Sequence, residues 1–355
     1  MGQHGGDIYS EEIQKQMAKE GRKFLDFSAN INPLGMPLGV RRAITEALDK
    51  AEHYPDPECR KLKKALAEYH GTAIDTLICG NGGADLIYRL VYAVKPGHAL
   101  LTAPTFLEYE EALKQVGTKV HLYEMPTDYR VRDDIKKQMT EEIDIMFLCN
   151  PNNPTGILVE QELLLEILEQ AAEKQILLVL DECFLDFTGQ EERSLIQKIK
   201  DYKNLFILKS FTKMYAMPGI RLGYGISGNR LLLKKMEAAG QCWGVSVLAS
   251  EAGVAALGER EYKEKSIALV REERAYLKQQ MEKAGFTVWD GQADYLFFRT
   301  DGICDLYERL LPEGIMIRRC SNYRGLDDTC YRVAVKDHEA NERLAEALKK
   351  TVKKR

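Results

Sequence analysis

The feature that most constrains the fold is a series of short, unbroken apolar segments in the middle of the chain. Residues 145–149, 176–180 and 205–208 are apolar throughout and do not alternate with polar residues. Such segments are typical of strands that are buried on both faces, as in a parallel sheet. Between the first two, the apolar residues of 160–174 fall on one helical stripe. Strand, helix and strand in this order predict a right-handed βαβ crossover, and therefore an α/β fold with a mostly parallel sheet. Further crossover helices are expected at 84–93 and 107–116.

The pattern changes after about residue 240, which indicates a second, smaller domain. A long helix is expected over 261–284, and a closing helix carries Leu344, Leu348 and Val352 on one side. Short strands are expected between these two helices, at 287–289, 295–299, 314–317 and 331–335. We therefore predict an N-terminal extended arm with turns (1–35), a large α/β domain with helices on both faces of its sheet (36–240), and a small α+β domain (241–355).

Composition excludes several classes of protein. A net charge of −4 over 355 residues argues against a nucleic-acid or anionic-membrane partner, since both require a basic field. No apolar run approaches 18 residues, and the first 22 residues lack an apolar core, so neither a membrane span nor a secretory signal is expected. The eight cysteines form no C-x-x-C pair and the six histidines no H-E-x-x-H motif. We expect reduced thiols, a cytoplasmic protein and no metal site.

The strongest chemical signal lies directly after the predicted strand 205–208. Lys213 stands there beside two hydroxyl residues, Ser210 and Thr212, and Arg221 follows eight positions later. A lysine whose amine is kept partly neutral by burial can form a Schiff base with an aldehyde cofactor. The two hydroxyls and the guanidinium could hold a phosphate by hydrogen bonds and charge.

Three other segments lie at the end of a predicted strand or just before a predicted helix. Asn153 lies in an Asn- and Pro-rich loop after strand 145–149, and Asp181 ends the next strand, where a buried carboxylate requires a partner. Gly82 and Gly83 precede a predicted helix, whose first backbone amides can hold an anion. Each segment alone also suits a plain turn. Together they lie where open α/β sheets bind their ligands.

With these segments in this order, the chain resembles the fold-type I pyridoxal-phosphate (PLP) enzymes, and among them the class I and II aminotransferases, over essentially its whole length. The resemblance implies that Lys213 carries PLP and moves protons at the substrate Cα. It also implies that Asp181 pairs with the pyridine nitrogen and that Asn153 donates to the phenolate oxygen of the ring. The residues implied for the cofactor phosphate are Gly82, Gly83, Ser210, Thr212 and Arg221.

Three further roles follow from the same resemblance. Phe106 would stack on the cofactor ring, and Arg332 would bind an anionic group of the substrate. Tyr54 matches a tyrosine that reaches the cofactor phosphate of the neighbouring subunit. The resemblance therefore implies a homodimer with composite active sites.

Within this family the sequence resembles two groups, the threonine-phosphate decarboxylases of cobalamin synthesis and the histidinol-phosphate aminotransferases. The segments similar to the first group are 4–6, 26–35 and 317–327. That resemblance implies decarboxylation of L-threonine O-3-phosphate, a small anionic amino-acid phosphate. Its phosphate and carboxylate would be fixed by His4, Asn30, Arg318 and Arg332. From composition alone His4 is a disordered tail residue, and the aminotransferase remains the alternative function.

Two positions depart from the aminotransferase pattern. Those enzymes usually place a tyrosine three residues after the pyridine aspartate, and here Phe184 provides no hydroxyl. This favours the decarboxylase, although Phe184 can also be read as an ordinary core aromatic. The usual Ala-Asn-Tyr sequence is here Ala293-Asp294-Tyr295, so the role of that asparagine is not carried over.

Overall fold

The computed structural model describes residues 4–18 and 24–353 of the chain. Residues 1–3 and 19–23 of the predicted arm and residues 354–355 of the predicted small domain lie outside the described residues.

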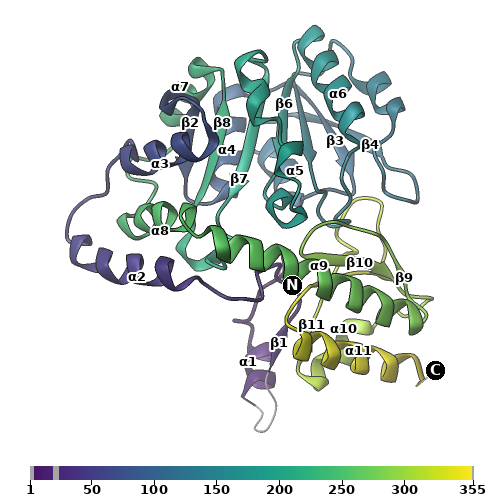
Figure 1. Cartoon of the computed structure of the whole chain (residues 1–355). Coiled ribbons are helices and arrows are strands. Elements are labelled where there is room, and N and C mark those ends of the chain that lie inside the picture. The colour runs from purple at the N-terminus through teal and green to yellow at the C-terminus, as the bar shows by residue number, and fades with distance from the viewer. Residues whose placement is uncertain (1–3, 19–23, 354–355) are drawn as a thin grey trace.

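A seven-stranded sheet stands at the centre, in the order β2-β8-β7-β6-β5-β3-β4 (Figure 1). Within it only β8 runs antiparallel to its neighbours, β2 and β7. The strands are β2 (Leu77–Gly80), β3 (His98–Ala103), β4 (Lys119–Glu124), β5 (Ile145–Cys149), β6 (Leu177–Asp181), β7 (Leu205–Ser210) and β8 (Gly223–Ser227). The predicted α/β fold with a mostly parallel sheet is confirmed.

Helices cover both faces of this sheet, which explains why its strands are apolar throughout. Phe147 of β5 belongs to one hydrophobic core, while Met146 and Leu148 on either side of it belong to the other. The first core is completed by α4 (Gly83–Val94), α5 (Leu107–Lys114) and α7 (Arg230–Ala239). The second is completed by α3 (Arg60–His70), α6 (Gln161–Glu173) and α8 (Val247–Leu257). A polar residue at any of these strand positions would enter one of the two cores.

The C-terminal part of the chain forms a four-stranded sheet, β12-β13-β10-β9, with antiparallel pairing. Its strands are β9 (Thr287–Val288), β10 (Tyr295–Arg299), β12 (Arg318–Arg319) and β13 (Cys330–Ala334), and its helices are α9 (Arg260–Lys283), α10 (Leu306–Leu310) and α11 (His338–Lys353). Val270 of α9 lies in a core of the large sheet, whereas Leu277 lies in the C-terminal core. The domain boundary at 240/241 stays a prediction, and α8, which follows it, packs against α2 (Leu38–Ala47) and α3.

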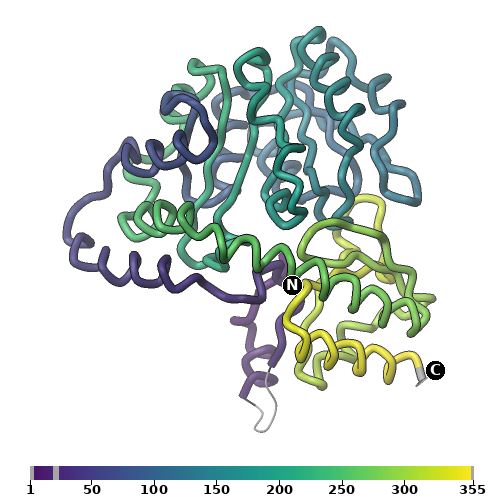
Figure 2. The backbone as a smooth tube through the Cα atoms, viewed as in Figure 1, coloured from purple at the N-terminus to yellow at the C-terminus, as the bar shows by residue number. Residues whose placement is uncertain are grey.

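The N-terminal arm is tied to the C-terminal part of the chain. Its strand β1 (Leu25–Asp26) pairs in parallel with β11 (Ile315–Met316), and Figure 2 shows the arm beside the small domain before it continues to α2. The predicted extended conformation is wrong for α1 (Glu11–Met17). Ser10 caps this helix through its side chain, and Ile13 is buried against Leu311 and Met316. Local capping and one buried apolar contact thus form a helix in a segment that is too polar to show a clear stripe.

No helix in the described part of the chain combines the length and the apolar character that crossing a membrane requires.

Candidate active site

A cavity of about 650 Å³ collects the predicted site residues from widely separated segments. Its walls come from the ends of β5, β6 and β7, the start of α4, the N-terminal arm, and the segment around β12 and β13. The predicted residues that line it are His4, Asn30, Gly83, Phe106, Asn153, Asp181, Ser210, Thr212, Lys213, Arg221, Arg318 and Arg332. The structure therefore brings together all of the predicted residues except Gly82 and Tyr54.

Lys213 lies in the turn after β7, and its side-chain nitrogen is 5.9 Å from the ring centre of Phe184. Desolvation by the surrounding side chains lowers the pKa of its amine, and Arg221 and Arg332 act in the same direction. A lowered pKa leaves more of the amine neutral, and only the neutral amine is a nucleophile. Lys213 is therefore suited to form a Schiff base with an aldehyde.

Asp181 ends β6 and is held by donors at both carboxylate oxygens. Tyr109 Oη donates to Oδ2 at 2.6 Å, and the backbone N–H of Cys183 donates to Oδ1 at 2.9 Å. Tyr109 was missed by the sequence reasoning, because it appeared only as one aromatic residue in a predicted helix. The ring of Phe106 packs edge-on against Tyr109, with 5.5 Å between the ring centres. Two elements, α5 and β6, thus fix the carboxylate that faces the cavity.

The turn before α4 requires glycine because of its backbone conformation, and it also lies close to Arg221. A Cβ atom on Gly82 would lie 2.5 Å from Arg221 Nη2, and φ at Gly82 is +88°. A Cβ on Gly223 would lie 2.7 Å from the backbone nitrogen of Gly83. This packing sets the guanidinium beside the first backbone N–H groups of α4, which is a suitable arrangement for an anion. Gly82 is therefore part of the site, although its atoms do not line the cavity.

The hydroxyls that flank Lys213 complete this arrangement. Ser210 Oγ donates to Thr212 Oγ1 at 2.7 Å and accepts from the Thr212 backbone N–H at 3.1 Å. Both side chains lie at the wall of the cavity. Hydroxyls, a guanidinium and helix N-terminal amides together form a donor set for a phosphate group.

A second group of donors lies across the cavity and centres on Asn153. Its Oδ1 accepts hydrogen bonds from Arg332 Nη1 and, at 3.4 Å, from Tyr323 Oη. Because Oδ1 is used in this way, the amide nitrogen of Asn153 is left to donate to a ligand. Arg332 also donates to the backbone oxygen of Ser28 at 3.0 Å. Tyr323 is a further residue whose role the sequence reasoning did not identify.

Arg318 stands next to this group. Its Nη2 donates to Asn322 Oδ1 at 2.9 Å, and its guanidinium lies 5.3 Å from the ring centre of Tyr323. Both Arg318 and Arg332 are buried. Two guanidinium groups at one cavity give it a local positive charge that suits an anionic ligand.

Asn30 and Asp294 are among the residues with buried oxygen atoms that have no hydrogen-bond partner within the described residues. Asn30 lines the cavity, and the atom without a partner is its Oδ1. Asp294 is fully buried, and neither of its carboxylate oxygens has a hydrogen-bond partner. Burial raises the pKa of Asp294 to about 7. An unpaired buried polar group costs about 1–3 kcal/mol, so the orphaned Oδ1 of Asn30 points to a ligand that donates a hydrogen bond to it.

Phe184 is packed as a core aromatic residue and also forms part of the cavity wall. Its ring packs edge-on against Tyr295, with 5.0 Å between the ring centres, and it also lines the cavity. Its influence on the chemistry stays a prediction.

Tyr54 lies away from this cavity. Its side chain is 80% exposed and stacks on Trp243, with 4.5 Å between the ring centres. A contribution to a neighbouring subunit would use such an exposed side chain, and it stays a prediction.

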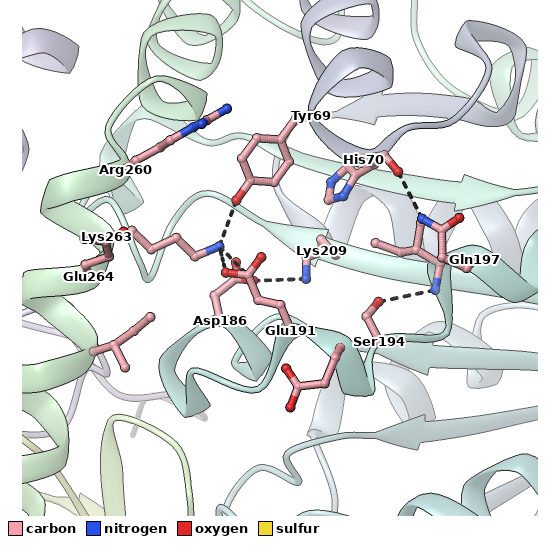
Figure 3. A pocket seen from close by; sticks show the side chains of 13 residues that line it. Tyr69, His70, Asp186, Glu191, Ser194, Gln197, Lys209, Arg260, Lys263 and Glu264 are labelled. Carbon is pink, nitrogen blue, oxygen red and sulfur yellow. Dashed lines mark hydrogen bonds and ion pairs between the residues drawn. The ribbon is translucent and has the colours of Figure 1, made fainter.

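A second cavity, of about 560 Å³, lies on the other side of β7 and holds a network of paired charges (Figure 3). Lys209 Nζ is 3.2 Å from Asp186 Oδ1, and Lys263 Nζ is 2.7 Å from Glu191 Oε1. Although burial acts to lower the pKa of Lys209, the nearby Asp186 and Glu182 raise it overall. Lys209 is therefore held as a cation, and only Lys213 of these two neighbouring lysines is suited to act as a nucleophile.

Comparison with known proteins identifies the class to which this fold and site belong. The sequence model of the family described as "Aminotransferase class I and II" matches residues 22–348. The chain therefore belongs to the class I and II aminotransferase family, and the predicted fold-type I architecture is confirmed.

Individual relatives fall into the two groups that the sequence resembles. The chain is similar to the threonine-phosphate decarboxylase of Salmonella typhimurium, with 38% identity over 98% of this chain and 95% of that protein. It is also similar to the adenosylcobalamin biosynthesis bifunctional protein CobDQ of Leptospira interrogans, with 29% identity over 98% of this chain and 40% of that protein. The crystal structure of the histidinol-phosphate aminotransferase of Clostridium acetobutylicum superimposes with a TM-score of 0.88 and 34% identity, covering 93% of this chain and 100% of that one.

Proposed function

We propose that this chain is a PLP-dependent decarboxylase that converts L-threonine O-3-phosphate to (R)-1-amino-2-propanol phosphate and carbon dioxide in cobalamin biosynthesis. The observation that carries the proposal is the composition of one cavity. It joins a nucleophilic lysine and a phosphate-binding turn to two buried arginines, Arg318 and Arg332. The similarity over nearly full length to the Salmonella decarboxylase supports the same substrate.

The residues present fit the cofactor. Lys213 would hold it covalently through Nζ, Asp181 would face its ring nitrogen, and Phe106 would lie against the ring. Its phosphate would be held by the amides at Gly82 and Gly83 and by Ser210, Thr212 and Arg221. When bound, PLP supplies a protonated ring that accepts the electrons of the bond broken at the substrate Cα.

Asp181 and Lys213 have separate tasks in this scheme. The two donors on Asp181 keep its carboxylate in a fixed position, from which it would face the ring nitrogen. The neutral Lys213 amine would first take a proton from the ammonium group of the substrate, and its lowered pKa would favour delivery of that proton to the Cα that loses its carboxylate. Asn153 would donate through its amide nitrogen to the ring oxygen.

The task of the remaining donors is orientation. The bond that breaks at Cα must stand perpendicular to the cofactor ring, so the protein must fix the substrate's phosphate and carboxylate at the same time. Arg318 and Arg332 can each form two parallel hydrogen bonds to such groups, and Asn30 and His4 add further donors. This set would fix both anionic groups of the substrate and so orient the bond between Cα and the carboxylate for cleavage.

Histidinol-phosphate aminotransferase activity is the second candidate, because a solved structure of that activity has the same fold at 34% identity. The two reactions require different bonds to be aligned at Cα. Phe184 favours the decarboxylase, since the aminotransferases of this type usually carry a tyrosine there.

The proposed enzyme is a cytoplasmic homodimer in which Tyr54 completes the partner's phosphate site. A mixture of Lys213→Ala and Tyr54→Phe chains tests this assignment. Each variant alone should be impaired, but a hybrid dimer would contain one site with both native residues. Recovery of activity on mixing supports composite sites, and no recovery in a proven hybrid contradicts them.

The substrate is tested with the purified protein loaded with PLP. L-Threonine O-3-phosphate labelled at its carboxyl carbon should release labelled carbon dioxide, and unphosphorylated L-threonine should react at least about 100-fold less efficiently, because several phosphate donors are left unpaired. Equal rates for the two compounds would contradict a phosphate-binding site.

A further inference from the structure

His4 of the N-terminal arm lines the cavity and contacts a glutamate that has no role in the proposed reaction. His4 Nε2 lies 2.7 Å from Oε1 of Glu108, which is in the first turn of α5. The His4 ring is 6.0 Å from the ring of Phe106, which is the residue expected against the cofactor. The contact therefore places the imidazole at the cofactor cavity, which His4 lines.

The arm is held in this position by its own close packing. The backbone N–H of Gly6 donates to Ser28 Oγ at 2.7 Å, and Ser28 Oγ donates to Asp26 Oδ1 at 2.6 Å. A Cβ on Gly5 would lie 2.1 Å from the backbone oxygen of Ser28, so only glycine allows this approach. His4 thus projects from a segment whose backbone is fixed two residues away.

Glu108 is also fixed from its other side. Tyr88 Oη, on α4, donates to Oε2 at 3.1 Å, which leaves Oε1 for His4. The hydrogen bond from His4 lowers the pKa of Glu108, so the side chain is a carboxylate at neutral pH. The Glu108 side chain is 18% exposed and that of His4 is 46% exposed, so Glu108 is the more firmly enclosed partner.

We propose that Glu108 is a positioning residue for substrate binding, which holds the His4 imidazole in a fixed orientation at the cavity. A carboxylate on one ring nitrogen fixes the orientation of an imidazole. Because Glu108 takes Nε2, the ring nitrogen left for a ligand is Nδ1. The inference rests on the proposed function, since it assigns this nitrogen to the substrate's phosphate.

The proposal predicts that removal of Glu108 changes ligand binding in the direction opposite to the one that charge repulsion alone would give. Removing a carboxylate near an anionic ligand should tighten binding if only the two charges mattered. Under the proposal, removal of Glu108 weakens binding, because His4 loses its fixed orientation. The sign of the change therefore separates a positioning residue from a carboxylate that competes with the substrate for His4.

The test is a double-mutant cycle on the PLP-loaded protein. The probe is 3-phospho-D-glycerate, which carries a phosphate and a carboxylate but no amine, so its binding can be followed by calorimetry without reaction. We expect Glu108→Ala and His4→Ala each to raise the Kd about tenfold, and the double variant to stay within about twofold of His4→Ala. Glu108→Gln, which keeps an acceptor but not the charge, should fall between wild type and Glu108→Ala. Glu111→Ala on the same helix, whose side chain pairs with Lys114, is the matched control and should bind as wild type does.

Turnover provides the second readout. With L-threonine O-3-phosphate, Glu108→Ala should raise KM about tenfold and leave kcat within about twofold. Unchanged or tighter binding in Glu108→Ala, or effects of the two single variants that simply add, would overturn the proposal. If the wild-type protein releases no carbon dioxide from this substrate, the proposed function fails, but the binding cycle still decides the role of Glu108.

Discussion

Tyr109 and Asp181 are joined by a 2.6 Å hydrogen bond from the phenolic hydroxyl to Oδ2, and both side chains are buried. The other oxygen of Asp181 accepts from the backbone N–H of Cys183. A carboxylate with both oxygens engaged cannot rotate, so its charge is held in one direction toward the cavity. This direction is what a pyridine nitrogen opposite Asp181 would require.

Tyr109→Phe should therefore weaken the enzyme through Asp181. Loss of one buried donor should cost about 1–3 kcal/mol of unfolding free energy and lower kcat about tenfold, because the carboxylate is less well fixed. Denaturant unfolding and steady-state kinetics measure the two effects. Tyr92→Phe, at a partly exposed position of α4, is the control. A Tyr109→Phe enzyme with native kcat would show that Asp181 does not depend on this bond.

Borohydride reduction of the PLP-loaded protein should attach the cofactor to one lysine. Peptide mass spectrometry is expected to find it on Lys213, whose pKa is lowered, and not on Lys209, whose pKa is raised by Asp186 and Glu182 against the effect of burial. Lys213→Ala should reduce kcat more than about 1000-fold, as expected for loss of a covalent catalytic group. Attachment at Lys209 would refute the assignment.

Asp294 should make the stability of the cofactor-free protein depend on pH. Its pKa is about 7 in the folded protein, against an ordinary value of 3.8. As the pH rises, the unfolded chain loses this proton first, so the contribution of Asp294 is fully present below about pH 4 and is lost by about pH 7. Asp294→Asn should therefore raise Tm by several °C at pH 8 and change it little at pH 4, as scanning calorimetry would show. An equal change in Tm at both values would mean that Asp294 is charged throughout.

Phe184→Tyr adds a hydroxyl to a side chain that lines the cavity close to Lys213. A donor to the cofactor's ring oxygen stabilises the deprotonated form, so the midpoint of the bound cofactor's pH-dependent colour change should fall by about one pH unit. Spectrophotometric titration measures this midpoint. No shift in a variant that still binds PLP would support the interpretation of Phe184 as a core aromatic only.

The sheet could be predicted from the sequence because strands that are buried on both faces are unbroken apolar segments. Met146, Phe147 and Leu148 alternate between two cores, so none of the three positions can be polar. The bounds of β10, Tyr295–Arg299, were predicted without error for the same reason. The helix α1 was not predicted, because its formation depends on the Ser10 cap and on contacts of Ile13 with residues about 300 positions away.

The site could be predicted where a residue type itself carries the chemistry. Lys213, Asp181 and Arg221 belong to motifs at strand ends, where ligands bind. Tyr109, Tyr323 and Glu108 act through partners that are distant in sequence, such as Asp181, Asn153 and His4. A tyrosine or glutamate on a helix or in a loop has no sequence signal for such a partner, so the structure was required to find these three.

The most direct test of the account is product analysis of the purified, PLP-loaded protein with two substrates side by side. One reaction contains L-threonine O-3-phosphate, and the other contains histidinol phosphate with 2-oxoglutarate. The account predicts carbon dioxide and 1-amino-2-propanol phosphate in equal amounts from the first, and no glutamate from the second. Glutamate from the second reaction, with no carbon dioxide from the first, would contradict it and identify an aminotransferase.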